Sequence, residues 1–129
     1  MLHEDLTNNI ICAFYKVYNT LGHGFLEKVY ENALAIELRN YYLQVKQQEA
    51  VKVFYEGIQV GDYYADIVVN DLVILELKSA DNLKNDHFAQ LTNYLKATDK
   101  EVGLLLNFGK KPEFKRILLT NDKKILHTD

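Results

Sequence analysis

The sequence predicts an α/β protein, a mixed β-sheet with helices packed on it, in a single domain over residues 1–129. Three observations lead to this fold class. Apolar residues recur at helical spacing up to residue 41, β-branched and aromatic residues dominate from residue 45 to residue 78, and helical spacing then returns before two short strand-like segments. The predicted element order is therefore α-α-β-β-β-α-β-β. A length of 129 residues is typical of one domain.

Three helices are expected. The first is defined by apolar residues spaced three or four apart, namely Leu6, Ile10, Phe14, Val17 and Leu21. Gly22 is a good stop for this helix, and a second helix follows Gly24 and runs to about Tyr41. The third helix is expected from Asn82 to Ala97.

Five strands are expected: Val45–Tyr55, Ile58–Val69, Leu72–Lys78, Val102–Phe108 and Phe114–Thr120. Gly57 marks the turn between the first two strands, and Gly61 with Asp62 marks a bend in the second. Asn70 and Asp71 are a hairpin signal between the second and third strands. The fourth segment is a short apolar run, which is typical of a buried strand.

Composition excludes several classes of protein. The single cysteine, Cys12, rules out a disulfide framework and zinc sites built on cysteine pairs, and the four histidines lack zinc-ligand spacing. No apolar run approaches the ~20 residues that a membrane span needs, so no membrane partner is expected. The polar start of the chain lacks the layout of a secretory signal. These features together predict an intracellular, cytoplasmic protein.

The net charge of −3 gives no support to a generic nucleic-acid-binding protein. The charge is unevenly distributed, however, because residues 1–99 carry 8 basic and 14 acidic side chains, whereas residues 100–129 carry 7 basic and 4 acidic ones. Six basic residues of the second part could contact phosphates: Lys110, Lys111, Lys115, Arg116, Lys123 and Lys124. Taken alone, such a cluster is more often a solvated rim.

Glu76 and Lys78 stand at the end of the apolar segment Leu72–Lys78. Side chains alternate along a strand, so both point to the same side. An exposed strand end with a harmless Glu–Lys pair is the simpler interpretation, and it is favoured when the pair is considered alone. A run this apolar nevertheless implies burial on both faces, and a buried carboxylate costs several kcal/mol unless a cation compensates it. The presence of a carboxylate at residue 76 therefore needs an explanation, such as a nearby cation.

Asp66 lies inside a predicted strand, where aspartate is uncommon unless the position is a sheet edge or a bulge. The hairpin at Asn70 and Asp71 leaves two registers open. A two-residue loop would pair Ala65 with Glu76 and turn Asp66 away, whereas a three-residue loop or a bulge would pair Asp66 with Glu76. Two such carboxylates repel each other unless a cation lies between them. The second register therefore predicts a hard-oxygen site suited to Mg²⁺ or Mn²⁺.

Further polar residues occupy helical positions that chemistry could use. Glu27 lies one turn into the second helix and shares a face with Tyr30, and Gln90 and Tyr94 lie one turn apart on the third helix. Each has a simpler explanation when taken alone. An acid near a helix N-terminus is favourable, and a polar helix face is common.

Three motifs follow one another along the chain: Gly24-Phe25-Leu26-Glu27-Lys28-Val29-Tyr30, then Asp66 with Glu76-Leu77-Lys78, then Gln90-Leu91-Thr92-Asn93-Tyr94. The first resembles the signature of the bacterial and archaeal GxxExxY family. The second is similar to the D…E-x-K core of the PD-(D/E)xK nuclease superfamily, to which that family is assigned. The third resembles the Q-x-x-x-Y element of the RecB-like exonuclease branch. The resemblance covers about residues 4–120 and implies a restriction-endonuclease-like core.

The resemblance also implies roles for individual residues. Asp66 and Glu76 would hold a divalent metal together with the backbone carbonyl of Leu77. Glu27 would complete the acidic cluster, directly or through a water. The metal would lower the pKa of a bound water and polarise the scissile phosphate. Lys78 would orient the attacking water and stabilise the charge of the transition state.

Supporting roles are implied for the remaining residues. Gln90 would orient the water or Lys78, and Tyr94 would support Gln90 or contact nucleic acid. Tyr30 would have a supporting or nucleic-acid-binding role. The flanking backbone would meet the basic residues Lys110, Lys111, Lys115 and Arg116. Two positions depart from the superfamily pattern. Ala65 replaces a proline, and His23 lies in a predicted loop rather than in a core helix, so the metal-binding role of the RecB-like histidine is not carried over.

Functions of different classes remain open. The first is a Mg²⁺- or Mn²⁺-dependent nuclease that hydrolyses phosphodiester bonds of DNA or RNA. The second is a nucleic-acid-binding or regulatory protein-interaction module that keeps the fold without turnover. A third is a structural or oligomeric protein, in which the nine tyrosines serve an interface. The intact set of Asp66, Glu76 and Lys78 favours the first. A domain this small would need a partner or a homodimer for sequence specificity.

Overall fold

The computed structural model describes residues 1–125, and residues 126–129, the end of the predicted domain 1–129, lie outside the described part. The elements follow the predicted order α-α-β-β-β-α-β-β. In chain order they are α1 (Glu4–Leu21), α2 (Glu27–Asn40), β1 (Val45–Tyr55), β2 (Ile58–Val69), β3 (Val73–Lys78), α3 (Asn85–Lys96), β4 (Val102–Phe108), β5 (Pro112–Leu118) and the short helical turn η1 (Asn121–Lys123).

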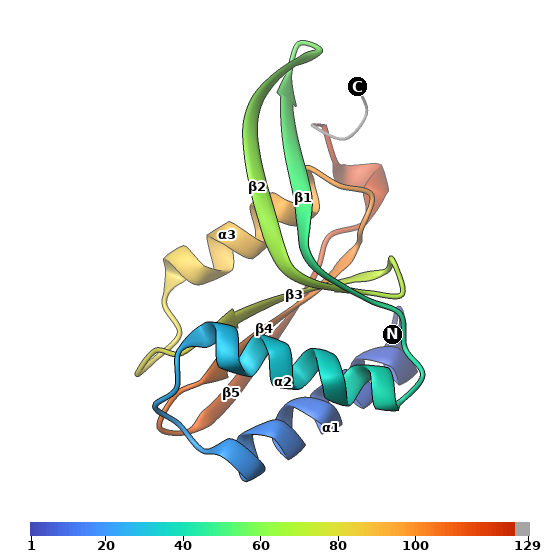
Figure 1. Cartoon of the computed structure of the whole chain (residues 1–129). Helices are drawn as coiled ribbons and strands as arrows, with labels where there is room; N and C mark the ends of the chain where they lie inside the picture. Colours follow the sequence, from blue (N-terminus) through green and yellow to red (C-terminus); the bar gives the residue numbers. More distant parts are fainter. Residues whose placement is uncertain (126–129) are drawn as a thin grey trace.

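One mixed sheet of five strands forms the centre of the fold, in the order β1-β2-β3-β4-β5. Within residues 1–125, β3 and β4 form the only parallel pair, and α3 makes the crossover between them. Helices α1 and α2 pack on one face of the sheet and α3 packs on the other (Figure 1). The predicted mixed sheet flanked by helices is thus confirmed. None of the described helices has the length and apolarity needed to cross a bilayer.

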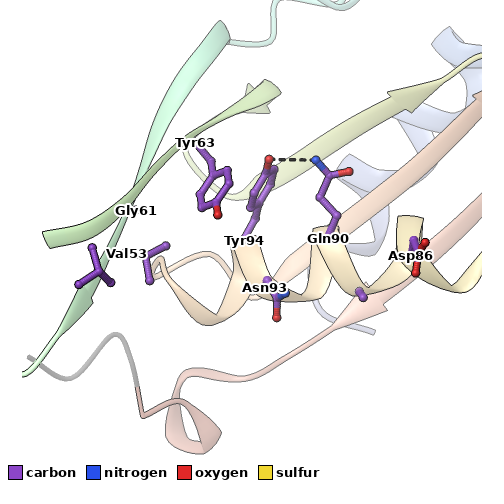
Figure 2. A pocket seen from close by; sticks show the side chains of 9 residues that line it. Val53, Gly61, Tyr63, Asp86, Gln90, Asn93 and Tyr94 are labelled. Atoms are coloured by element: carbon purple, nitrogen blue, oxygen red, sulfur yellow. Dashed lines mark hydrogen bonds between the residues drawn. The ribbon is translucent and has the colours of Figure 1, made fainter.

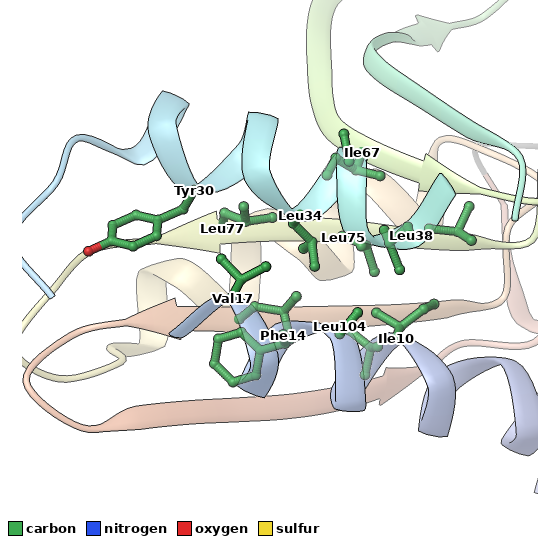
Figure 3. Close-up of a cluster of buried hydrophobic side chains, with 14 of the residues drawn as sticks. Ile10, Phe14, Val17, Tyr30, Leu34, Leu38, Ile67, Leu75, Leu77 and Leu104 are labelled. Carbon is green, nitrogen blue, oxygen red and sulfur yellow. The ribbon is translucent and has the colours of Figure 1, made fainter. Parts of the chain in front are cut away.

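The helices are held to the sheet by their predicted apolar faces. Ile10 and Phe14 of α1 are fully buried, and Val17 is nearly so. They pack with Leu34 of α2 in the cluster shown in Figure 3. Burying a side chain of this size contributes about 1.5–3 kcal/mol. This packing fixes both helices on the sheet, and it therefore fixes Glu27 at the start of α2.

Strand β3 sends alternate side chains to the two faces. Leu75 and Leu77 are buried beneath α1 and α2 (Figure 3), whereas Ile74 is buried beneath α3. By the same alternation, Glu76 and Lys78 project to the face that carries α3. Burial of β3 on both faces agrees with its apolar sequence.

Strands β1 and β2 extend beyond the rest of the sheet as a long curved hairpin (Figure 1). β2 pairs with β1 at ten positions but with β3 at only three. The pairing with β1 shifts by one residue between Val53 and Phe54, opposite Gly61, so the bend predicted at Gly61 and Asp62 is present as a β-bulge. Only the last three residues of β2, from Ile67 on, pair with β3, and the part of β2 before Ile67 pairs with β1 alone.

Helix α3 begins at Asn85, later than the predicted Asn82. The preceding Lys84 is extended, with φ −119° and ψ 164°, and its N–H donates to Nδ1 of His87 at 3.1 Å. This is a capping interaction in which a histidine takes the place of the usual glutamate or glutamine. The predicted start at Asn82 is therefore three residues too early.

Candidate active site

The connection between β2 and β3 decides the register of the site. Asn70 and Asp71 have positive φ values of 53° and 55°, as in a two-residue turn, and the Leu72 N–H donates to Val69 O at 2.9 Å. The ladder nevertheless resumes only at Val73, which pairs with Val69. Leu72 is therefore an extra residue, and the connection counts as a three-residue loop.

This connection places Asp66 opposite Glu76. Regular pairing stops one position earlier, at Ile67 and Leu75. Each carboxylate then takes the place of a backbone acceptor, because the Asp66 N–H donates to Glu76 Oε1 at 3.0 Å and the Leu77 N–H donates to Asp66 Oδ2 at 2.8 Å. The two carboxylates thus lie at the point where β2 parts from β3.

Burial changes the acidity of this pair. Glu76 is only 3% exposed, and burial, together with the charge of Asp66, raises the pKa of Glu76 from 4.5 to about 8. The pKa of Asp66 is also raised, first by burial, while the hydrogen bond from the Leu77 N–H opposes the rise. Two adjacent, poorly solvated carboxylates must either bind a cation or take up a proton.

Lys78 lies on the same face and is held from α3. Its Nζ donates to Gln90 Oε1 at 3.0 Å. Gln90 Nε2 in turn donates to the Tyr94 hydroxyl at 3.0 Å (Figure 2). Gln90 and Tyr94 are four residues apart on one helix face, and Tyr94 is buried. A chain of hydrogen bonds anchored in the helix therefore sets the position of the Lys78 ammonium.

Glu27 lies next to this group, at the first position of α2. Its Oε2 accepts a hydrogen bond from the Ser79 N–H at 3.0 Å, and its charge is one of the influences that raise the pKa of Glu76. Within residues 1–125, no three or more His, Cys, Asp or Glu side chains are arranged as a metal site. The structure therefore brings Asp66 and Glu76 together and places Glu27 beside them, without a three-carboxylate cluster.

Tyr30 is fully buried. Its hydroxyl donates to Gly22 O at 2.5 Å and accepts from the Phe25 N–H at 3.2 Å, and its ring stacks on Phe108 with centroids 4.3 Å apart. These contacts hold the loop that leads into Glu27. The tyrosine thus occupies a supporting position beneath the loop.

Two residues that the sequence analysis did not assign, Gln48 and Glu31, lie next to the carboxylate of Asp66. Gln48 Nε2 donates to Glu31 Oε1 at 2.8 Å and to Asp66 Oδ1 at 3.4 Å, and the charge of Glu31 raises the pKa of Asp66. Glu31 is 3% exposed and also accepts from Lys28 Nζ at 3.1 Å. Glu31 follows Glu27 by four residues in α2, so helical spacing alone puts both on one face and could have identified Glu31.

Gln48 could not have been found in that way, because its orientation depends on a local change of the backbone. Its φ of 54° lies in the left-handed region, which costs a non-glycine residue about 1–3 kcal/mol. Gln47 and Glu49 on either side pair regularly with β2. The strain at this one residue turns its side chain toward the carboxylates.

The chain leaving β3 is held against β4. Asn107 is fully buried, its Nδ2 donates to Ala80 O, and its Oδ1 accepts from the Ala80 N–H, both at 2.9 Å. A Cβ on Gly109 would lie 2.2 Å from Ala80 O, so only glycine fits there. These contacts fix the segment that follows Lys78, including the Ser79 N–H that binds Glu27.

Asn107→Ala is expected to lower the free energy of unfolding by about 2–3 kcal/mol, because it leaves the Ala80 N–H and carbonyl without their partner and opens a small cavity. Urea denaturation followed by circular dichroism measures this change. Asn9→Ala, on the exposed face of α1, is the control and should change stability by less than about 0.5 kcal/mol. Equal stability of the two variants would contradict the structural role of Asn107.

The basic residues that the sequence analysis singled out do not form one surface: they lie in the turn after β4 and on both faces of β5. Lys110 and Lys111 are exposed in the turn after β4, at the same end of the sheet as Lys78, because β3 and β4 run parallel. Lys115 pairs with Leu105 and so shares the α3 face. Arg116 is on the opposite face and donates to Leu2 O.

Lys124, a further member of the predicted basic cluster, is 5% exposed. Its Nζ donates to the carbonyls of Thr98 and Lys100. This lysine therefore closes the loop after α3, and its ammonium is directed at backbone carbonyls rather than at solvent.

Comparisons with known proteins identify the superfamily and the fold of the chain. The sequence matches the PD-(D/E)XK nuclease superfamily over residues 4–117. The fold is similar to the crystal structure of SSO0001, with a TM-score of 0.55, 16% sequence identity, and coverage of 92% of this chain and 60% of that chain. The chain thus spans less than two thirds of that protein, and the likeness concerns the fold, which is restriction-endonuclease-like. No curated protein matches the sequence. Because the superfamily match covers most of its length, the chain belongs to the PD-(D/E)XK nuclease superfamily.

Proposed function

We propose that the protein is a divalent-metal-dependent nuclease that hydrolyses phosphodiester bonds of DNA or RNA with Mg²⁺ or Mn²⁺. The proposal depends on one observation, the poorly solvated carboxylates of Asp66 and Glu76 beside a Lys78 that Gln90 holds in place. Superfamily membership supports a nucleic-acid substrate and a divalent metal. The G-x-x-E-x-x-Y motif at residues 24–30 further supports assignment to the GxxExxY family.

The donor atoms fit a hard cation. Asp66 and Glu76 supply carboxylate oxygens, and Leu77 supplies a backbone carbonyl oxygen, which are ligands that Mg²⁺ and Mn²⁺ prefer. Asp66 Oδ1 accepts a long hydrogen bond from Gln48 at 3.4 Å, so it retains lone-pair capacity. Glu27 adds a further negative charge nearby. When bound, the metal would polarise the scissile phosphate and lower the pKa of a water.

The remaining side chains would act on the substrate. Hydrolysis joins a water oxygen to phosphorus and breaks one P–O ester bond, so negative charge grows on the phosphate oxygens. The Lys78 ammonium would stabilise that charge, and its bond to Gln90 keeps it in position before the reaction. Tyr94 in turn holds Gln90. Lys110 and Lys111 would bind phosphates that flank the scissile one.

Asp66→Ala is expected to abolish both Mn²⁺ binding and cleavage, because it removes one of the two central carboxylates. Calorimetric titration with Mn²⁺ measures the first, and degradation of single-stranded DNA, duplex DNA and RNA measures the second. The matched control is Asp62→Ala, an exposed aspartate on the same strand, which should behave as the wild type.

Each outcome of this experiment decides between the two functions. Binding and cleavage that vanish only in Asp66→Ala support the nuclease. Full activity of Asp66→Ala would overturn the site assignment. A wild type that neither binds Mn²⁺ with a phosphate ligand present nor cleaves any of the three substrates would overturn the proposal and leave a module that keeps the fold without turnover.

A further inference from the structure

A pocket of about 590 Å³ lies between the β1–β2 hairpin and α3. This volume is in the range of small-molecule sites. Tyr63 of β2 and Tyr94 of α3 meet across it, with ring centroids 5.9 Å apart and ring planes inclined by 41° (Figure 2). The Tyr63 side chain is 51% exposed, whereas Tyr94 is 6% exposed. One ring is thus held in the wall while the other faces solvent.

The pocket adjoins the candidate active site, with which it shares two residues. Two of its lining residues, Gln90 and Tyr94, are the residues that hold Lys78. A group bound in the pocket would therefore lie beside a phosphate placed at Lys78.

The chemistry of the lining suits a flat, neutral group with a polar edge. Besides the two tyrosines, the wall contains apolar Val53 and Val60, and Asn93, Gln90 and Asp86 supply hydrogen-bonding groups. The described lining residues include no lysine or arginine, so the pocket offers nothing that would attract a phosphate. Nucleobases combine an aromatic face with donors and acceptors along the edge, and they stack on tyrosine.

Gly61 leaves room for the exposed ring of Tyr63. A Cβ at this position would lie 3.1 Å from Cε2 of the Tyr63 ring and 3.3 Å from Cβ of Val53, which is tighter than an ordinary contact. The absence of a side chain therefore lets the Tyr63 ring lie against the strand at the edge of the pocket.

We propose that this pocket binds one unpaired nucleobase of the substrate strand, stacked on Tyr63 and recognised at its edge by Asn93 and Asp86. This inference rests on the proposed nuclease function and names its substrate as single-stranded nucleic acid. In a duplex the base is stacked between its neighbours and paired, so it enters such a pocket only at the cost of unstacking and unpairing.

The experiment measures binding of fluorescein-labelled single-stranded DNA, single-stranded RNA and duplex DNA by fluorescence anisotropy. Ca²⁺ is present as an oxygen-seeking cation, and a gel confirms that the oligonucleotide stays intact. Tyr63→Ala should weaken single-strand binding about 5- to 150-fold, which is the loss expected for one stacked base. Tyr63→Phe should bind as the wild type. Tyr64→Ala is the matched control, because Tyr64 is the next residue and is 53% exposed, and it should leave binding unchanged.

A second measurement locates the base. One abasic nucleotide is moved along the single strand, and one position should weaken binding to the wild type but not to Tyr63→Ala. Thermal melting of each variant separates loss of the pocket from loss of the fold. Equal binding by Tyr63→Ala and Tyr64→Ala, or duplex binding as tight as single-strand binding, would overturn the base-binding pocket even if Mn²⁺-dependent cleavage is observed. Tyr63-dependent single-strand binding without cleavage under any metal would keep the pocket and overturn the nuclease.

Discussion

Lys78→Met is expected to lower cleavage about 10²- to 10³-fold while leaving Mn²⁺ binding unchanged. A loss of this size is typical when an enzyme loses one hydrogen-bond donor that stabilises the negative charge of the transition state, here the charge that grows on the phosphate. Methionine is unbranched and matches the lysine stem as far as Cε, so most of the packing around this position is kept while the ammonium and its bond to Gln90 (3.0 Å) are lost. The carboxylates of Asp66 and Glu76 retain their contacts to backbone N–H groups.

Single-turnover cleavage and Mn²⁺ calorimetry on the same preparation separate these effects. Lys52→Met, at an exposed position of β1, is the matched control and should cleave as the wild type. Cleavage by Lys78→Met at the wild-type rate would remove Lys78 from the reaction. Loss of both metal binding and cleavage would instead show that the lysine holds the carboxylates in place.

Glu76→Gln is expected to stabilise the metal-free protein at pH 8. The pKa of Glu76 is raised from 4.5 to about 8 in the folded protein, so the folded state binds a proton more tightly than the unfolded state. The contribution of Glu76 to the free energy of unfolding is therefore most favourable below pH 4.5. It falls as the pH rises toward 8, by up to roughly 5 kcal/mol. Glutamine carries no charge, and its amide oxygen can still accept the hydrogen bond from the Asp66 N–H.

Urea unfolding in EDTA at a series of pH values measures this difference. The advantage of Glu76→Gln over the wild type should grow between pH 5 and pH 8, whereas Glu56→Gln, in the exposed hairpin turn, should run parallel to the wild type. Saturating Mn²⁺ at pH 8 should recover stability in the wild type, about 2.7 kcal/mol at a hundredfold excess over Kd, and not in Glu76→Gln. A pH-independent difference would contradict the raised pKa of Glu76.

Much of the site follows from periodicity. The apolar run of β3 and the two-residue repeat of a strand put Glu76 and Lys78 on one face. The four-residue spacing of Gln90 and Tyr94 puts both on one side of α3. Neither statement needs more than a short stretch of chain, and the described structure agrees with both. The pairing of Asp66 with Glu76 was one of two registers that the sequence allowed.

Long-range contacts decided what periodicity left open. Gln48 joins Glu31 to Asp66 only because one residue of β1 adopts a left-handed backbone conformation. Lys115 and Arg116 are consecutive in β5, so strand alternation alone puts them on opposite faces. Only the pairing of β5 with β4 decides that Lys115 is the one that shares the α3 face.

By itself, the sequence determined the order of the elements and which side chains of one helix or strand share a face, because these depend on the 3.6- and 2-residue periods of a single element. Only the tertiary structure decided that Asp66 lies opposite Glu76, that Glu27 lies beside this pair, and that a pocket opens between the hairpin and α3. These depend on a one-residue choice at the turn after Val69 and on where β2 parts from β3. A single inserted residue shifts every pairing beyond it, and the packing of the whole sheet selects the register.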